Sequence, residues 1–222
     1  MVRLRRMTSA LAKIAEFPAN PVDMFKQILQ AAAKGHPDGL LVDMNLATLD
    51  EEFGVLNRTV IYRGLTEDNF PFYITHRYTR NFKNLQANPK AGICFYMTNV
   101  QDNEGKDLVT WQVRLIGAKA VELPDCEMDA LWAKEELVSQ IRGHICPCGE
   151  PIDYDVLKAK HDKFLEDHLA SGKDLERPKS YTAFKFVPQR WDFLKVGRGE
   201  IADRVQYRLQ DNGKWEAMHV ST

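Results

Sequence analysis

The chain has 222 residues, of which 44% are hydrophobic and 27% are charged, and this composition excludes disorder as its main character. Its 30 basic and 31 acidic residues give a formal net charge of -1, so no overall attraction to nucleic acid or to anionic membranes is expected. Four irregularly spaced cysteines do not form a secreted disulfide framework, and no apolar run approaches the roughly 18 to 20 residues of a membrane span. These features predict a soluble protein of a reducing compartment, in which any charge-based function is local.

The first 19 residues are predicted to form a basic N-terminal tail, and residues 20–222 a single domain. Every charged residue before Glu16 is basic, and the tail lacks the apolar core of a secretory signal. A cytoplasmic location is the favoured interpretation, with a mitochondrial presequence as the alternative.

Residues 20–35 are predicted to form the first helix. Asn20 can cap its N-terminus, Pro21 suits the first helical position, and Gly35 can end it. Apolar residues at helical spacing give it one face that packs against the rest of the domain.

From Leu40 onward, runs rich in β-branched and aromatic residues alternate with Gly, Asn and Asp clusters, a pattern typical of antiparallel strands and turns. Strands are predicted over residues 40–49, 55–65, 70–75, 91–97 and 109–123, the last long enough to bend, and three or four more over 182–188, 190–196, 203–210 and 214–220. Helices are predicted over residues 79–87, 124–137 and 154–172, and a polar hairpin loop over residues 100–107. The predicted fold class is α+β, an antiparallel barrel of about eight strands with peripheral helices.

Three arginines are candidates for binding a phosphate group. Arg58 and Arg63 belong to one predicted strand, and Arg80 lies near the start of the following helix. Guanidinium groups and the N-terminal amides of helices both bind phosphate. Gln112 lies in the middle of a strand, where its amide could bond to a ring heteroatom. Spacing alone leaves open that all four are ordinary polar surface residues.

Other sequence patterns give no support for a metal or nucleotide site. His144, Cys146 and Cys148 form an H-x-C-x-C sequence that lacks the usual zinc-ligand spacing, so we interpret it as a loop with incidental thiols and predict no metal site. The sequence contains no G-x-G-x-x-G, P-loop or G-x-S-x-G pattern. A dinucleotide-binding fold, an NTPase and a nucleophile-elbow hydrolase are therefore disfavoured.

The segment RTVIYRG, residues 58–64, resembles the Arg-x-x-Leu-Leu-Lys motif of the pyridoxine (pyridoxamine) 5'-phosphate oxidase family. Further similarities follow in the family's order, in the segments FPFYITHRYTRNFKNLQANPKAGICFYM, WQVRLIGAKAVEL, VSQI, RPKSYTAFKFVPQRWDFLKVG and ADRVQYR. The resemblance covers roughly residues 20–210.

This resemblance implies an FMN-binding split β-barrel that forms a homodimer, with FMN at the subunit interface. By position, the residues implied to contact FMN are Arg58, Thr59, Val60, Ile61, Ile74, Thr75, Arg80, Asn81, Gln112, Leu194 and Arg204. Arg80 would hold the phosphate of the flavin, and Arg63 and Ser139 would contact a small-molecule substrate.

The departures from the family lie mostly on the substrate side. Asn81 replaces a second phosphate-binding cation, Leu194 replaces a tryptophan beside the flavin, and a Gln-Ser pair falls on Cys148 and Gly149. The Tyr, Arg and Ser that bind the substrate phosphate fall on Leu131, Glu135 and Ser139, and an Arg-x-His motif falls on residues 200–202, Glu-Ile-Ala. The resemblance thus predicts an FMN-dependent oxidation of a B6-type amine or alcohol by oxygen, with an altered substrate-phosphate pocket. A non-catalytic FMN-binding dimer and an FMN-dependent reductase of another substrate are the alternatives.

Overall fold

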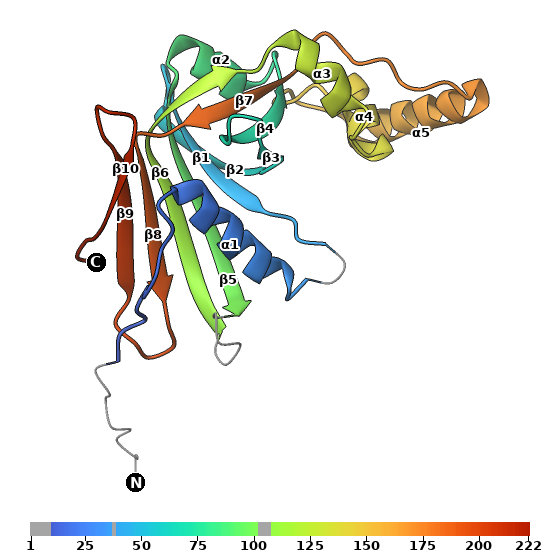
Figure 1. Ribbon diagram of the computed structural model, residues 1–222. Helices are drawn as coiled ribbons and strands as arrows, with labels where there is room; N and C mark the ends of the chain where they lie inside the picture. Colours follow the sequence, from blue (N-terminus) through green and yellow to red (C-terminus); the bar gives the residue numbers. More distant parts are fainter. Residues whose placement is uncertain (1–9, 37–38, 102–107) are drawn as a thin grey trace.

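A curled antiparallel sheet of ten strands organises the computed structural model, which describes residues 10–36, 39–101 and 108–222 (Figure 1). The strands are β1 Asp43–Asp50, β2 Gly54–Ile61, β3 Gly64–Leu65, β4 Pro71–His76, β5 Lys90–Gln101, β6 Leu108–Glu122, β7 Tyr181–Val187, β8 Arg190–Val196, β9 Asp203–Leu209 and β10 Trp215–His219. The helices in the described residues are α1 Pro21–Ala33, α2 Arg80–Ala87, α3 Asp125–Trp132, α4 Leu137–Ile145 and α5 Tyr154–Ser171.

The long strand β6 joins the two parts of the sheet. Its first half pairs with β5 and β8 within the order β10-β9-β8-β6-β5-β1-β2, and its second half, Lys119–Glu122, pairs with β7, which continues to β4 and β3. Between the halves, Gly117 has a φ of +63°, and a Cβ there would lie 2.7 Å from the side chain of Gln189. The bend predicted for this strand is therefore confirmed, and glycine permits it.

Side chains along β6 alternate between the core and the opposite face of the sheet. Val113 and Leu115 are buried in the main core, whereas Gln112 and Arg114 point away from it. Helix α1 covers the core side, where Phe25 packs against Phe95 of β5. The helix has the predicted Asn20 cap, whose side chain accepts the N–H of Val22.

The segment before α1 lies against the start of β9. Leu11 and Ile201 form a parallel bridge, and Ala12 and Ile14 are buried. The N–H of Ile14 donates to Oδ2 of Asp203 over 2.8 Å. Main-chain and side-chain bonds thus fix residues 11–14 beside the strand that carries Arg204.

Two predicted elements differ from the structure, and one helix was not predicted. The predicted strand 55–65 is two strands, β2 and β3, because the chain turns before Gly64, whose φ of +126° suits only glycine. The predicted helix 124–137 ends at Trp132, and α4 was missed. Gly143 weakens the helical signal of α4, and it gives room to the ring of His76, which lies 3.0 Å from where a Cβ would be.

The strand count of about eight was too low, since the sheet has ten. The predicted loop 100–107 begins later than expected, because β5 runs to Gln101, and residues 102–107 lie outside the described part of the chain. His144 belongs to α4 rather than to a loop. No described helix is both long and apolar enough to cross a membrane.

Candidate functional site

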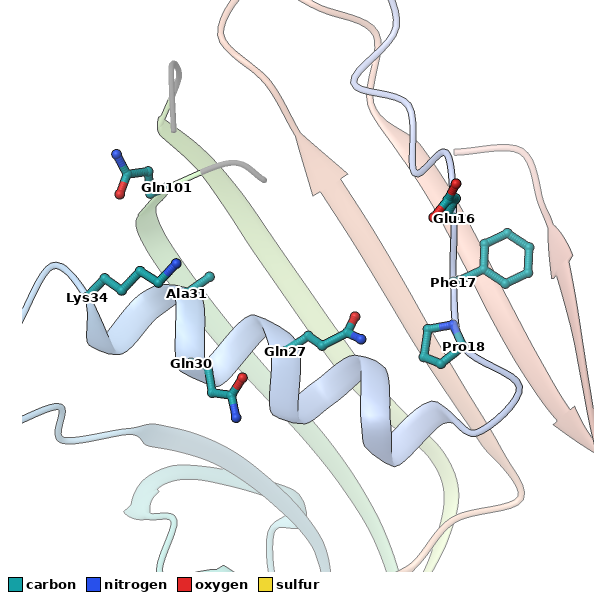
Figure 2. A pocket seen from close by; sticks show the side chains of 8 residues that line it. All are labelled: Glu16, Phe17, Pro18, Gln27, Gln30, Ala31, Lys34 and Gln101. Atoms are coloured by element: carbon teal, nitrogen blue, oxygen red, sulfur yellow. The ribbon is translucent and has the colours of Figure 1, made fainter. Parts of the chain in front are cut away.

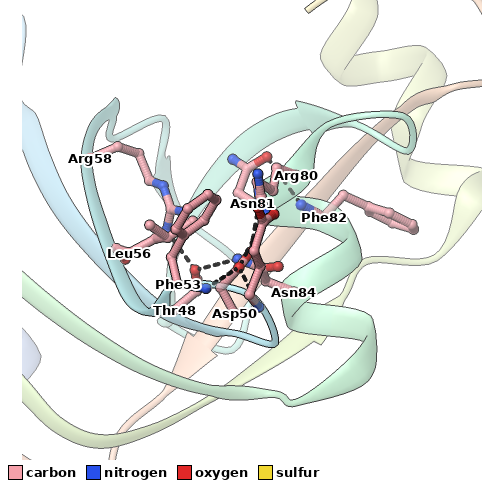
Figure 3. Close-up of polar contacts among 10 residues, drawn as sticks. Thr48, Asp50, Phe53, Leu56, Arg58, Arg80, Asn81, Phe82 and Asn84 are labelled. Atoms are coloured by element: carbon pink, nitrogen blue, oxygen red, sulfur yellow. Dashed lines mark hydrogen bonds and ion pairs between the residues drawn. The ribbon is translucent and has the colours of Figure 1, made fainter. Parts of the chain in front are cut away.

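Two of the three candidate arginines, Arg58 and Arg80, lie in one polar cluster between the β1–β2 hairpin and α2 (Figure 3). Nη1 of Arg58 donates to Oγ1 of Thr48 over 2.7 Å and to the carbonyl oxygens of Leu46 and Leu56, each over 3.2 Å. Burial lowers the pKa of Arg58, but an arginine remains protonated in proteins. The contacts therefore fix a cation in the wall of the barrel.

Arg80 is the first residue of α2 and is held by the tip of the hairpin. Its Nε donates to Oδ2 of Asp50 over 2.8 Å, its Nη2 to Oδ1 over 3.2 Å, and Nη2 also pairs with Glu52. Hydrogen bonds with these carboxylates raise the pKa of Arg80, and the bond from Arg80 lowers the pKa of Asp50. Among the described residues, Nη1 of Arg80 has no hydrogen bond, so this edge of the guanidinium keeps its donors.

The start of α2 adds neutral donors beside Arg80. Thr79 caps the helix by accepting the N–H of Phe82, and its hydroxyl lies 2.9 Å from that of Thr75. Oδ1 of Asn81 accepts the N–H of Phe82 over 3.0 Å. The amide nitrogen of Asn81 keeps no partner among the described residues and can donate. A helix N-terminus with these side chains can bind an anion.

The four remaining predicted residues of β2 and β4 do not all face this cluster. Val60 packs against the main core, on the same face as Arg58, whereas Thr59 lies on the opposite face. Ile61 follows at the end of β2, and Ile74 packs against the smaller apolar cluster below α3.

Gln112, Leu194 and Arg204 are directly opposite one another in the register of β6, β8 and β9. Directly opposite residues share a face of the sheet, so all three point away from the core. Arg58 pairs with Leu46 on the core face instead. In one chain, Arg58 and the residues at the start of α2 therefore do not converge with Gln112, Leu194 and Arg204.

A buried carboxylate lies beside the second group. Asp192 of β8 is 1% exposed and accepts bonds from Nη2 of Arg114 over 2.9 Å and from the amide of Gln206 over 3.1 Å. Its Oδ1 is 3.6 Å from Nε of Arg204, which is buried and has no hydrogen bond among the described residues. Arg204 thus has an unused buried donor.

The third arginine, Arg63, lies apart from the cluster and is bound by an acid. Its Nη2 donates to Oε2 of Glu135 over 2.8 Å, and the hydroxyl of Tyr181 donates to Oε1 over 3.2 Å. Desolvation and the charge of Glu135 raise the pKa of Tyr181. Ser139 lies in the first turn of α4, close in sequence to Glu135, with no side-chain bond among the described residues.

Of two cavities of similar volume, one adjoins the site. One, of about 600 Å³, lies beside Arg80 and is lined by the hairpin tip, by α2 and by residues 148–150, so Cys148 and Gly149 reach the predicted phosphate site. Another, of about 630 Å³, lies between α1 and residues 16–18 and contains none of the predicted residues (Figure 2).

Comparisons with known proteins connect this geometry to a family, although no family model matches the sequence. The chain is 27% identical over 213 residues to the pyridoxine/pyridoxamine 5'-phosphate oxidase of Bacteroides thetaiotaomicron, covering 93% of this chain and 91% of that protein. It is 26% identical over 204 residues to the enzyme of the same name from Idiomarina loihiensis, covering 90% and 88%. The chain is a divergent relative of the pyridoxine/pyridoxamine 5'-phosphate oxidases.

Solved structures confirm the split-barrel fold expected of such a relative. PhzG from Burkholderia lata, in complex with tetrahydrophenazine-1-carboxylic acid, has a TM-score of 0.74 at 18% identity and covers 97% of this chain and 100% of its own. A pyridoxamine 5'-phosphate oxidase-related, FMN binding protein from Nostoc punctiforme has a TM-score of 0.65 at 18% identity, with coverage of 93% and 100%.

Sequence reasoning missed two acids that position arginines in this relative of the oxidases. Asp50 orients Arg80, and Asp192 lies between Arg114 and Arg204. Asp192 could have been noticed, because it is a lone acid within the apolar strand sequence RWDFLKV. Asp50 carried no such signal, since an acid at a hairpin turn is ordinary.

Proposed function

We propose that the chain is an FMN-binding flavoprotein that oxidises a B6-type amine or alcohol and passes the electrons to oxygen. The observation that carries this proposal is the donor cluster at the start of α2, where Thr75 and Arg80 lie at a helix N-terminus and Arg58 is fixed in the adjacent hairpin. The names of its relatives and the FMN binding stated for the Nostoc protein agree with it.

The residues present fit a flavin phosphate. The exposed edge of Arg80, the amide of Asn81 and the first N–H groups of α2 are donors, and phosphate is an acceptor only. The buried Nε of Arg204, which has no hydrogen bond among the described residues and lies 3.6 Å from Oδ1 of Asp192, belongs to the second predicted group and is also a donor. A neutral amide at Asn81 in place of a cation lowers the affinity expected for FMN without removing the site.

A homodimer is part of this proposal. Arg58 lies on the core face of the sheet, whereas Gln112, Leu194 and Arg204 lie on the opposite face of the same chain, so a complete site needs a second copy. The outer face that carries Gln112 also exposes Tyr96, which is directly opposite it in the register. An aromatic side chain exposed on a sheet face is typical of an interface.

When bound, FMN would supply the acceptor for a hydride and the route of electrons to oxygen. Arg80 and the amides of α2 would hold its phosphate, and Arg58 would add a fixed positive charge nearby. Gln112 would direct its amide at the flavin ring. Arg63 and Ser139 would lie on the substrate side, where Glu135 alters the pocket.

A non-catalytic FMN-binding dimer is the second candidate. Residues 200–202 read Glu-Ile-Ala, and Ile201 is occupied by main-chain bonds with residues 10–12. This segment therefore offers neither a guanidinium nor an imidazole to a substrate. The cofactor-side donors do not depend on that segment, so binding without turnover is consistent with them.

Flavin binding is tested by the absorbance of the purified protein and by titration of the apoprotein with FMN. We expect a yellow protein, and Arg58→Ala and Arg80→Ala should each weaken FMN binding about tenfold to a hundredfold. Lys90→Ala, which removes an exposed cation at the start of β5, is the control and should have no effect. A colourless wild-type protein that takes up no added FMN contradicts the proposal.

Catalysis and assembly need separate measurements. Anaerobic mixing of the flavin-loaded protein with pyridoxamine or pyridoxamine 5'-phosphate should bleach the flavin absorbance, and readmitted oxygen should restore it. Sedimentation should give the mass of a dimer. A yellow dimer that neither compound reduces supports the non-catalytic candidate. A cytoplasmic location belongs to the same proposal, and cell fractionation tests it.

A further inference from the structure

The carboxylate of Glu135 is held inside the protein at the position where a phosphate-binding cation is expected. Its side chain is 5% exposed, and it lies in the turn between α3 and α4, where its N–H donates to the carbonyl oxygen of Trp132 over 3.0 Å. Arg63 reaches it from the link between β2 and β3, and Tyr181 from the start of β7. Three separate segments therefore converge on this one carboxylate.

The surroundings of this group strengthen its electrostatic effect. Tyr181 and Trp132 are buried in the smaller apolar cluster together with Met128, and their rings lie 5.0 Å apart. Charges that are poorly hydrated interact more strongly than charges in water. Arg63 is 33% exposed, so the pair is open to the solvent only from the arginine side.

This arrangement neutralises Arg63, the cation that the resemblance places on the substrate side. Arg63 uses Nη2 on Glu135, and the acid is fixed in place by the Tyr181 hydroxyl. A phosphate ester with nearly two negative charges would have to approach Arg63 beside a fixed carboxylate, which repels it. A hydroxyl group meets no such repulsion, because the carboxylate has acceptor sites that Arg63 and Tyr181 do not use.

We propose that Arg63, Glu135 and Tyr181 form a selectivity element that disfavours phosphorylated ligands and favours an unphosphorylated ligand with a hydroxyl group at this end. This rests on the proposed function, since it names the substrate class of the same flavin site. Glu135 acts here as the specificity-determining residue, and Tyr181 positions it.

The test compares pyridoxamine with pyridoxamine 5'-phosphate, which differ only in the hydroxyl or phosphate at one end. Calorimetric titration of the flavin-loaded protein gives both dissociation constants without relying on turnover. The variants are Glu135→Gln, which removes the charge at nearly constant shape, and Glu135→Arg, which reverses it. Glu136→Gln is the matched control, because it removes the charge of the next, exposed residue.

We expect the wild-type protein to bind pyridoxamine at least as tightly as the phosphate ester. The ratio of the two affinities should shift toward the ester about tenfold in Glu135→Gln and about a hundredfold in Glu135→Arg, as charge-assisted bonds form with the phosphate. Glu136→Gln should leave the ratio unchanged.

Two results would overturn the inference. One is a wild-type preference for the phosphate ester of tenfold or more, and the other is a Glu135→Arg protein that shows no gain in affinity for the ester, including one that binds neither compound. The flavin absorbance of each protein is recorded first. A protein without flavin contradicts the proposed function itself, whereas a yellow protein that prefers the ester contradicts only the selectivity element.

Discussion

The same contact, an arginine bound by a buried carboxylate, occurs on the cofactor side and on the substrate side of the proposed site, with different consequences. On the cofactor side, Asp50 is 4% exposed and Arg80 is 49% exposed, so the acid lies behind an arginine whose outer edge faces the solvent. On the substrate side, Glu135 binds an arginine that is more enclosed. Geometry alone does not explain the difference, because both acids are buried.

The groups that surround each arginine explain it. Arg80 is bound by Asp50 and Glu52, but it lies at the start of α2, where N–H groups and the side chain of Asn81 supply further donors. Glu135, which binds Arg63, belongs to residues 122–136, which contain one basic and six acidic residues, a net charge of -5. The carboxylates beside Arg80 therefore leave donors for an anion, whereas Glu135 neutralises Arg63 in an acidic segment.

The largest difference between the two sides should be seen in flavin binding. Arg80→Gln should weaken FMN binding about a hundredfold, because it removes the cation nearest the proposed phosphate position. Arg63→Gln should change it less than about threefold, because Arg63 is already neutralised and lies on the other side. Fluorescence titration of the two apoproteins gives both values, and equal losses would show that the two regions are not distinct.

Stability should distinguish the two partners of the substrate-side pair. Arg63→Gln leaves the carboxylate of Glu135 buried with only Tyr181, and we expect a loss of about 2 to 3 kcal/mol in the free energy of unfolding. Glu135→Gln leaves Arg63, which can still reach the solvent, and should cost about 1 kcal/mol or less. Urea unfolding measures both. The reverse order of losses would mean that the carboxylate is better hydrated than its burial indicates.

Much of the fold could be predicted from the sequence because its signals are local. The Asn20 cap of α1, the alternation along β6 and the length that allows this strand to bend each depend on a few neighbouring residues. Helix α4 could not be predicted in this way. Gly143 weakens its local helical signal, and the ring of His76, against which Gly143 lies, is distant in the sequence.

The same distinction between local and distant contacts applies to the proposed site. The positions of Arg58 and Arg80 at one cluster follow from their places on a strand and at a helix start. The acidic partners of Arg80 and Arg63 do not follow from the sequence, since Asp50 precedes Arg80 by thirty residues and Glu135 follows Arg63 by seventy-two. A sequence indicates which residues carry charge, but pairing between distant segments decides which charges remain available.

Asp192 offers a smaller test of how the second group of residues is held. Asp192→Asn removes the charge that faces Arg114 and Arg204 while keeping the shape of the side chain. If this acid orients Arg204 for the flavin, FMN affinity should fall about tenfold, the loss of one charge-assisted contact. Asp174→Asn, in the loop before β7, is the control. An unchanged affinity in Asp192→Asn would show that Arg204 does not depend on this acid.

The smallest expected effect is a difference in acid sensitivity between the two sides. Burial lowers the pKa of His76 to about 4, with the charges of Arg142 and His144 adding to the shift, and its ring packs on Tyr78 and Tyr181 beside α4. Because the unfolded histidine has a pKa of about 6.5, the unfolded state binds more protons between pH 6.5 and 4, and stability falls as the pH falls through this range.

On the cofactor side, the pKa of Asp50 is lowered in the folded protein. Its contribution to stability is therefore fully present above the pKa of about 4 that it has in the unfolded chain, and it is lost as the pH falls toward the lower pKa of the folded protein. From pH 7 to 5, the wild-type protein should therefore lose about 1 kcal/mol more stability than His76→Gln, a figure reduced for the partial exposure of the ring. Hydrogen exchange at pH 5 should show the amides of α4 losing protection before those of α2. His76 would be excluded as the cause if both helices lost protection equally, or if the stability of His76→Gln had the same pH dependence as that of the wild-type protein. The two sides would then not differ in acid sensitivity.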